Sequence, residues 1–256
     1  MDLQSAALSF ANGFAATRSL TYPFEVIRHE DLIAMRDSPH RTKRGRAQEV
    51  IGVQLAADEA IRQIKSYRPQ GRWFYCAIQS PEADLAAHRD EVKRHGMRLM
   101  HHEPFFVFSR PQFTPLTIER EIVRVQDVEL ASEVNDLCRS RQILAEHLLE
   151  DSPIRLYAAL QNDQVVGYVR SVDAGDNSTW VSNLAVLPHA RRQGFGHALM
   201  ARLLNDDFER GVAHVVLLAS SDGTPLYESM SFSRIGTLQM FQPVAKIWAQ
   251  FLSETT

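Results

Sequence analysis

The sequence of 256 residues is poor in cysteine and contains no long apolar segment. Its two cysteines, Cys76 and Cys138, are too few for a disulfide scaffold or a cysteine metal site, which favours a reducing compartment. No run approaches the roughly 18 consecutive apolar residues that cross a bilayer, and residues 6–16 lack the basic start of a signal peptide. We therefore expect a cytoplasmic protein that has no membrane partner and needs no metal.

An excess of charge of either sign is also missing. The 28 Lys and Arg residues and the 31 Asp and Glu residues give a net charge of −3, which gives no reason to expect nucleic acid as a partner. Residues 41–46 form a basic run that is typical of a solvated loop. Hydrophobic residues make up 45% of the chain, and its length suits one large or two small domains.

Three prolines, Pro104, Pro111 and Pro115, indicate a domain boundary, and we divide the chain into residues 1–112 and 113–256. The second part has the clearer pattern. It predicts strands over residues 118–125, 156–160, 165–172, 179–187, 214–219 and 232–241. It predicts helices over residues 128–149, from Phe195 to a stop at Gly211, over 225–230 and over 244–252.

The first part is harder to interpret, and its fold is left open. Residues 46–66 predict a helix with one apolar face, formed by Val50, Val53, Ala57, Ile61 and Ile64. A strand over 73–78, a helix over 81–95 that stops at Gly96, and one or two strands over 97–108 follow. Because this order echoes residues 214–243, a degenerate repeat of the second part is one interpretation of this α/β domain.

The predicted helix after Phe195 has its charges reversed. Arg191 and Arg192 lie at its positive end, and Asp206, Asp207 and Glu209 lie near its negative end, against the preference of the helix dipole. Residues 188–196 contain no Ser, Thr, Asp or Asn to cap the backbone N–H groups. Several local rules broken together indicate a functional site, and free N–H groups beside cations and glycines favour a phosphate-bearing ligand.

Three kinds of phosphate-binding loop are possible here. The dinucleotide fingerprint fails because Leu199 stands where its third small residue is needed, and the Gly-Lys-Ser/Thr of a P-loop is absent. In contrast, Arg191-x-x-Gly194-x-Gly196 resembles the Arg/Gln-x-x-Gly-x-Gly/Ala motif of the GNAT acyltransferase superfamily. Residues 183–188 resemble the strand before that motif, and residues 226–232 resemble its Leu-Tyr-x-x-x-Gly-Phe signature.

The resemblance implies a fold of the α/β (α+β) class, with a mixed, mainly antiparallel sheet flanked by helices over about residues 118–242. It implies an N-acetyltransferase that moves an acetyl group from acetyl-CoA, its co-substrate, to a primary amine by direct attack. Backbone groups of residues 192–197 would hold the pyrophosphate, and strand 183–187, splayed from its neighbour after the break at Pro188, would pair with the pantetheine arm. The residues it assigns to the cofactor are Leu184, Ala185, Val186, Arg191, Arg192, Gln193, Gly194, Phe195, Gly196, His197 and Ser220.

The same resemblance makes Tyr227 the acid that protonates the departing thiolate, with a packing tyrosine as the alternative. The general base stays unassigned, because strand 179–187 has no carboxylate where many members of the family place a Glu. A water relayed by Ser182, a backbone carbonyl or Asn183 is one candidate, and a nearby carboxylate such as Asp222 is another. Ser231 stands where the signature has the glycine of its Gly-Phe pair, so the match is incomplete there.

Two alternatives remain open at this point. The missing carboxylate also fits a non-catalytic acyl-CoA-binding sensor or interaction protein that kept the fold. Trp180 fits either the acceptor site or the core, while the adjacent His101, His102 and Glu103 are interpreted as structural, since neighbours on a strand point to opposite faces. We expect a small-molecule or peptide amine as acceptor, in a cleft between the two parts, and a monomer or homodimer.

Overall fold

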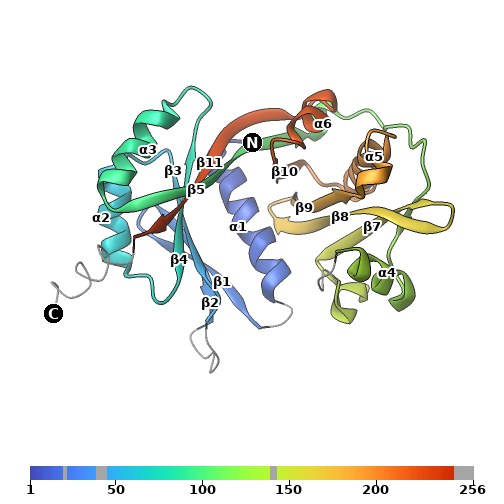
Figure 1. Cartoon of the computed structure of the whole chain (residues 1–256), viewed down its shortest axis with the longest axis horizontal. Helices are drawn as coiled ribbons and strands as arrows, with labels where there is room; N and C mark the ends of the chain where they lie inside the picture. The colour runs from blue at the N-terminus through green and yellow to red at the C-terminus, as the bar shows by residue number, and fades with distance from the viewer. Residues whose placement is uncertain (20–21, 39–44, 139–142, 245–256) are drawn as a thin grey trace.

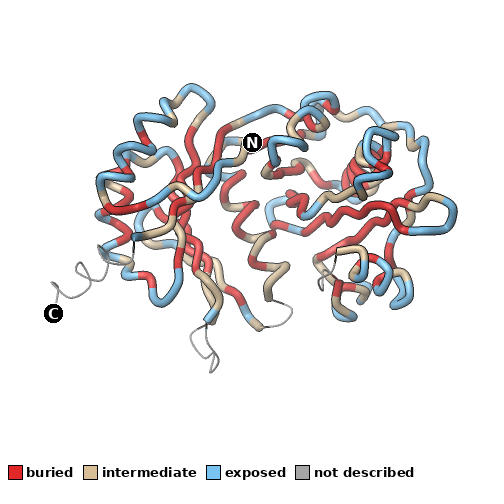
Figure 2. The backbone as a smooth tube through the Cα atoms, in the orientation of Figure 1, coloured by how far each residue is buried: buried red, intermediate tan, exposed pale blue. Residues whose placement is uncertain are grey.

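The computed structural model describes residues 1–19, 22–38, 45–138 and 143–244. Its strands form one mixed sheet of order β1-β2-β3-β4-β11-β5-β10-β9-β8-β7-β6, in which antiparallel pairs dominate (Figure 1). Helices lie against both faces of this sheet, as the fold class from the sequence predicts. Figure 2 shows that buried residues follow the strands and the central helix α1.

In the part of the N-terminal half that the structure describes, there are five strands and three α-helices. In chain order these are α1 Leu3–Ser19, β1 Phe24–His29, β2 Leu32–Asp37, β3 Gln48–Val53, α2 Ala57–Tyr67, β4 Trp73–Gln79, α3 Leu85–Arg94 and β5 Met97–Ser109. Asp84 caps α3 by accepting from the N–H groups of Ala86 and Ala87, and Gly96 follows it with a φ of 74°. Gly96 is the signal from which the end of this helix was predicted, whereas the cap at Asp84 makes α3 begin at Leu85 and not at residue 81.

The described residues of the C-terminal half form six further strands and three α-helices. They are β6 Ile122–Arg124, α4 Val128–Cys138, β7 Ile154–Gln161, β8 Gln164–Gly175, β9 Ser178–Val186, α5 Phe195–Glu209, β10 His214–Leu218, α6 Thr224–Ser229 and β11 Ser233–Pro243. Both hairpins in this half turn through two residues with positive φ, at residues 162–163 and 176–177. Asn and Asp tolerate that conformation, so the turn residues fix the register of β7, β8 and β9.

The two halves exchange their last strands. Strand β5 leaves the N-terminal half and pairs antiparallel with β10, while β11 leaves the C-terminal half and pairs antiparallel with β4. The two exchanged strands also pair with each other at the centre of the sheet. On either side of them the order is mirrored, with parallel pairs β3–β4 and β9–β10. The division at residue 112 stays a prediction, but both parts share one sheet and the same order of elements.

Several sequence predictions of elements are wrong. The helix predicted over 46–66 is strand β3 followed by α2, because β3 is buried along all six residues between two neighbours, and such a run carries no strand alternation. The strand predicted over 118–125 covers only residues 122–124. Of the helix predicted over 128–149, residues 128–138 form α4 and residues 145–148 form a separate 3-10 helix. Residues 139–142 of that prediction lie outside the described residues, as do residues 41–44 of the basic run and residues 245–252 of the helix predicted over 244–252.

Helix α1, which the sequence did not predict, packs on the concave side of the sheet. Phe10 and Phe14 meet Trp180 of β9 with ring centroids 5.6 and 5.9 Å apart. A Cβ on Gly13 would lie 2.6 Å from the Trp180 Cβ, so only glycine allows this approach. Trp180 is therefore a core residue that joins α1 to the C-terminal half, as the core interpretation predicts.

Candidate functional site

Strands β9 and β10 separate part of the way along their length. Their parallel pairing covers only residues 178–180 of β9 and 214–216 of β10, although β9 continues to Val186 and β10 to Leu218. Asn183, with a φ of 53°, forms a bulge against β8, and the paired register shifts between Ser182 and Ala185. The gap thus opens after Trp180, earlier in the chain than the break at Pro188 from which we expected it.

The connection from β9 to α5 wraps over the open end of this gap. Arg192 has a φ of 62° and Gly194 a φ of 87°, so the chain turns twice through the left-handed region before α5 begins at Phe195. Within the described structure no side chain caps this helix, and Gly194 occupies the N-cap. The first backbone N–H groups of α5 are therefore available to an anion.

Gly196 lies where the start of α5 meets α6 and β9. A Cβ there would lie 3.4 Å from Leu226 Cδ2 and 4.0 Å from Val186 Cγ2, so it would point between α6 and β9. The neighbouring Arg191, Arg192, Gln193, Gly194 and His197 are exposed, while Phe195 is buried and anchors the turn. The structure thus brings the predicted cofactor residues of this loop to the mouth of the gap, together with Leu184, Ala185 and Val186 of β9.

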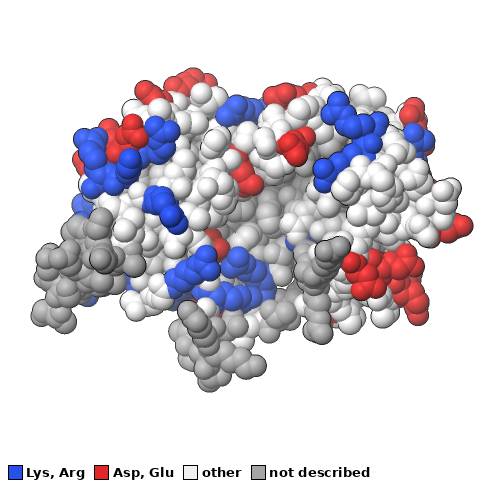
Figure 3. All heavy atoms as spheres, viewed as in Figure 1, with Lys and Arg blue, Asp and Glu red and all other residues white. Residues whose placement is uncertain are grey.

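One residue of this loop's surroundings was missed in the sequence. Arg120 donates from Nε to the carbonyl oxygen of Gln193 over 2.9 Å, and its guanidinium lies 5.5 Å from the Phe195 ring centroid. Arg191 in turn donates to the Val186 carbonyl oxygen over 3.0 Å. No local motif marks Arg120, because 73 residues separate it from Gln193. In Figure 3 basic side chains gather over the same part of the surface as α5.

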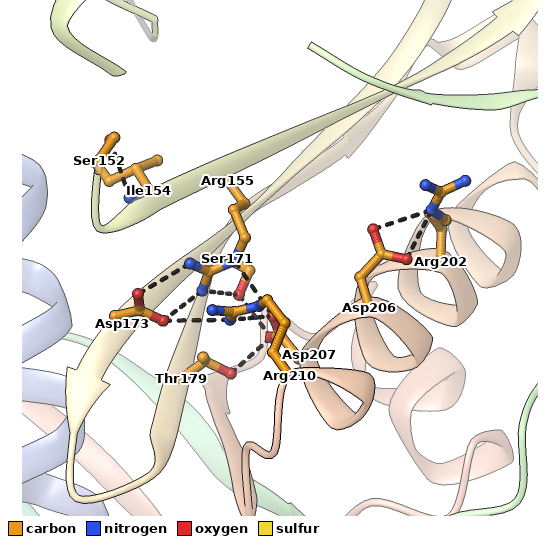
Figure 4. Close-up of polar contacts among 10 residues, drawn as sticks. All are labelled: Ser152, Ile154, Arg155, Ser171, Asp173, Thr179, Arg202, Asp206, Asp207 and Arg210. Carbon is orange, nitrogen blue, oxygen red and sulfur yellow. Dashed lines mark hydrogen bonds and ion pairs between the residues drawn. The ribbon is translucent and has the colours of Figure 1, made fainter. Parts of the chain in front are cut away.

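The acidic end of α5 has a structural role. Asp207 is fully buried and accepts from Ser171 Oγ at 2.6 Å and from Thr179 Oγ1 at 2.8 Å (Figure 4). Its other oxygen lies 2.9 Å from Arg210 Nη2 and 3.4 Å from Arg155 Nε. Only the arginine end of the reversed charge pattern therefore remains a functional signal.

Tyr227 lies on α6 with its ring between two aromatic side chains. The centroids of Phe106 and Phe232 are 6.1 and 5.6 Å from that of Tyr227, whose exposed fraction is 6%. Burial raises the pKa of Tyr227 to about 12, so the phenol keeps its proton at neutral pH. A Cβ on Gly223 would lie 3.3 Å from both Tyr227 and Ser220 Oγ, which shows that these two predicted residues share one corner.

Two further features of the family signature can be tested by geometry. Ser231, at the position of the expected glycine, has a φ of 64°, so the glycine preference at this position has a backbone cause. Among the candidates for the base, Ser182 is buried and accepts from Arg170 Nη2 over 2.9 Å, whereas Asn183 and Asp222 are exposed. None of these observations assigns a base.

His147 lies beside Arg170 beneath α4. It is 5% exposed, and its Nδ1 accepts from the Leu144 backbone N–H over 3.2 Å. Burial, and then the charge of Arg170, lowers the pKa of His147 to about 4 from its ordinary 6.5. A group whose folded-state pKa is lowered in this way binds its proton first in the unfolded chain, so acid destabilises the fold.

We predict that the unfolding free energy falls by roughly 3 kcal/mol as the pH drops from about 6.5 to about 4, and that His147→Gln removes much of this dependence. Urea denaturation at a series of pH values measures it. His95→Gln is the control, because His95 is more exposed, at 31%, and already bonds to Asp58. A slope that His147→Gln leaves unchanged would show that other groups set the acid sensitivity.

The N-terminal half has no equivalent of this gap in the described structure. Strands β3 and β4 pair over residues 48–53 and 73–78, and Gln54 N–H continues the ladder to the Ile78 carbonyl at 2.8 Å. Residues 54–56 alone connect β3 to α2, where the C-terminal half uses residues 187–194.

Within the described residues, no group of three or more His, Cys, Asp or Glu side chains is placed to hold a metal ion. None of the described helices is long and apolar enough to cross a membrane.

Comparison with known proteins agrees with this geometry. Residues 121–232 match the family model of the acetyltransferase (GNAT) family, and this segment is a GNAT domain. A GCN5-related N-acetyltransferase from Kribbella flavida superposes with a TM-score of 0.64 at 16% identity, over 95% of this chain and 96% of its own. A GCN5-related N-acetyltransferase from Sphaerobacter thermophilus gives a TM-score of 0.51 at 14% identity, over 93% and 92%.

A third structure is similar over most of the chain. It is a conserved protein of unknown function from Staphylococcus epidermidis, with a TM-score of 0.58 at 12% identity, over 86% of this chain and 94% of its own. At such low identities these similarities show the fold alone. Because each of them covers most of this chain, the shared fold includes both halves. No curated protein sequence matches the chain.

Proposed function

We propose that the C-terminal half transfers an acetyl group from acetyl-CoA to a primary amine. The observation that carries the proposal is the gap between β9 and β10, together with the uncapped start of α5, which follows β9 in the chain. Backbone N–H groups of residues 192–197 would bind the pyrophosphate, and Leu184 and Val186 would pair with the amides of the pantetheine arm. Ser220 would contact the same arm at the end of β10.

The chemistry that follows is direct attack. The amine nitrogen bonds to the thioester carbonyl carbon, while backbone N–H groups, that of Val186 first, polarise the carbonyl oxygen. As the C–S bond breaks, Tyr227 gives its proton to the sulfur, and it can do so because burial keeps the phenol protonated. Neither Cys76 on β4 nor Cys138 on α4 lies in the loop or the gap, so no acyl-enzyme is expected.

The variant Tyr227→Phe tests the acid. Its turnover is expected to fall by about 100-fold, because the thiolate then leaves without a proton donor, while the dissociation constant of acetyl-CoA stays nearly the same. Steady-state release of CoA thiol and calorimetric binding measure the two quantities. Phe232→Leu is the control for packing, since the Phe232 ring touches Tyr227 without carrying a proton. Turnover retained in Tyr227→Phe would remove this residue from the reaction.

A non-catalytic acyl-CoA sensor is the second candidate, and the lack of a carboxylate on β9 favours it. The two functions differ in one measurement. An enzyme releases CoA from acetyl-CoA when an amine is present, whereas a sensor binds acetyl-CoA and leaves it intact with every amine offered. The acceptor is proposed to be a small-molecule or peptide amine that enters between the two halves, and the protein to work in the cytoplasm as a monomer or homodimer.

A further inference from the structure

Strand β5 brings a carboxylate from the N-terminal half to the gap in the C-terminal half. Pairing of β5 with β10 ends at Phe105 and Leu218, and Ala219 N–H then donates to the Pro104 carbonyl oxygen over 2.9 Å. The next residue of β5 in this direction is Glu103, and the next residue after Ala219 is Ser220. Glu103 therefore lies beside the residue that we expect to contact the pantetheine arm.

The side chain of Glu103 is on the face of the sheet opposite Tyr227. Side chains alternate along β5, and Phe105 and Val107 pack in the cluster around α1, while Phe106 packs against Tyr227. Glu103 shares the face of Phe105. The electrostatics agree with this placement. Cys76 belongs to the cluster around α1, and the pKa of its thiol is raised by burial and then by the carboxylates of Glu49 and Glu103.

Glu103 can be reached by solvent and has few charged neighbours. Its side chain is 33% exposed, and its Oε2 lies 4.0 Å from Nε2 of His101 on the same strand. Burial raises the pKa of Glu103, and His101 lowers it to a lesser extent. The elements packed nearby present Cys76 from β4 and the apolar Leu238 and Met240 from β11, and Arg18 is the only charged side chain of α1.

We propose that Glu103 accepts the proton of the acceptor amine, an assignment that rests on the proposed function of the gap. The neutral amine enters from the face of α1 and attacks the thioester carbonyl carbon, forming the C–N bond. One N–H proton passes to a Glu103 carboxylate oxygen while the C–S bond breaks and Tyr227 protonates the sulfur from the other face. Glu103 then loses its proton to water beside His101, and the products are the acetylated amine and CoA thiol.

This assignment supplies the carboxylate that β9 lacks. It also gives the strand exchange a chemical consequence, because the reacting amine would be held by both halves of the chain: the base on β5 and the acid on α6. Figure 3 shows the viewed face hollowed where the two halves meet, with acidic side chains on one side of the hollow and basic side chains on the other. An acidic group there suits an acceptor that arrives as a cation in equilibrium with its neutral amine.

The variants Glu103→Gln and Glu103→Asp test the proposal, with Glu25→Gln as the matched control. Glu25 is also a strand carboxylate, 38% exposed and 4.0 Å from a basic partner, Arg36, but it lies on the edge strand β1. The probes are tyramine, spermidine and a short peptide with a free amino terminus. CoA release is followed from pH 6 to about pH 10, and acetyl-CoA binding is measured by calorimetry.

We expect Glu103→Gln to lower kcat/KM for the accepted amine by about 100-fold and to leave in its pH profile only the acidic limb that comes from protonation of the amine itself. Glu103→Asp should recover part of the rate, and Glu25→Gln should match the unaltered chain. Acetyl-CoA affinity and thermal stability should stay the same in all three. An unchanged rate and profile in Glu103→Gln overturns this assignment alone. Binding of acetyl-CoA with no CoA release for any probe overturns the acetyltransferase function and this assignment together, and absence of binding overturns the site itself.

Discussion

Acetyl-CoA binding is expected to be lost when both loop glycines are replaced, as Gly194→Asp with Gly196→Asp. The Cβ at position 196 would enter the space between Leu226 and Val186, where the pantetheine arm is expected. A side chain at position 194 is strained at a φ of 87°, and two carboxylates would repel the pyrophosphate. We expect the dissociation constant to rise by at least about 100-fold in calorimetry, which corresponds to about 3 kcal/mol.

The control for this variant is Gly211→Asp, at the other end of α5. Gly211 also has a positive φ, of 91°, and a Cβ there would meet nothing within 4 Å. It therefore reproduces the backbone strain and the added charge while leaving the loop intact. If Gly211→Asp weakened binding as much as the double variant, or if the double variant bound acetyl-CoA normally, the loop would not be the pyrophosphate site.

The loop could be found from the sequence because its signals are local. The arginines, the two glycines and the missing cap lie within a few residues of one another, and each has a physical meaning that does not depend on the rest of the fold. The same holds for the hairpins at residues 162–163 and 176–177 and for the stop at Gly211, where the turn residue itself requires a positive φ.

The helix predicted over residues 46–66 is wrong at β3 because this strand is buried on both faces. Residues 50–53 form an apolar run that fits a helical face as well as a strand, and only the pairing with β2 and β4 decides between them. The strand exchange is a harder case. Nothing in β5 or β11 says that each pairs with the opposite half, because pairing partners far apart in the chain leave no local pattern.

Because long-range pairing leaves no local pattern, the site residues that the sequence did not reveal are those placed by distant parts of the chain. Arg120 supports the loop from another part of the chain, and Glu103 reaches the gap only because β5 crosses to β10. The sequence pattern therefore identifies the cofactor side of the site, which is built from consecutive residues. The acceptor side is assembled by tertiary pairing, and it became visible only in the structure.

The reversed charges on α5 lead to the second large effect, which is on stability. The variant Asp207→Ala is expected to lower the free energy of unfolding by about 3 to 5 kcal/mol, the range found when one partner of a buried ion pair is removed. Arg155, with 4% of its side chain exposed, would keep Asp173 as its counter-ion, but Ser171 and Thr179 would lose their acceptor inside the core. Urea denaturation followed by circular dichroism measures the loss.

Asp206→Ala is the matched control, one residue away on the same helix. Asp206 pairs with Arg202 at 2.9 Å on a partly exposed surface, so its loss should cost less than about 1 kcal/mol (Figure 4). Because Asp207 joins α5 to β7, β8 and β9 at the end remote from the loop, its loss should weaken acetyl-CoA binding only through the unfolded fraction. Comparable losses in the two variants would mean that the buried cluster is no stronger than a surface pair. A specific loss of affinity in still-folded Asp207→Ala would mean that the acidic end of α5 acts on the site after all.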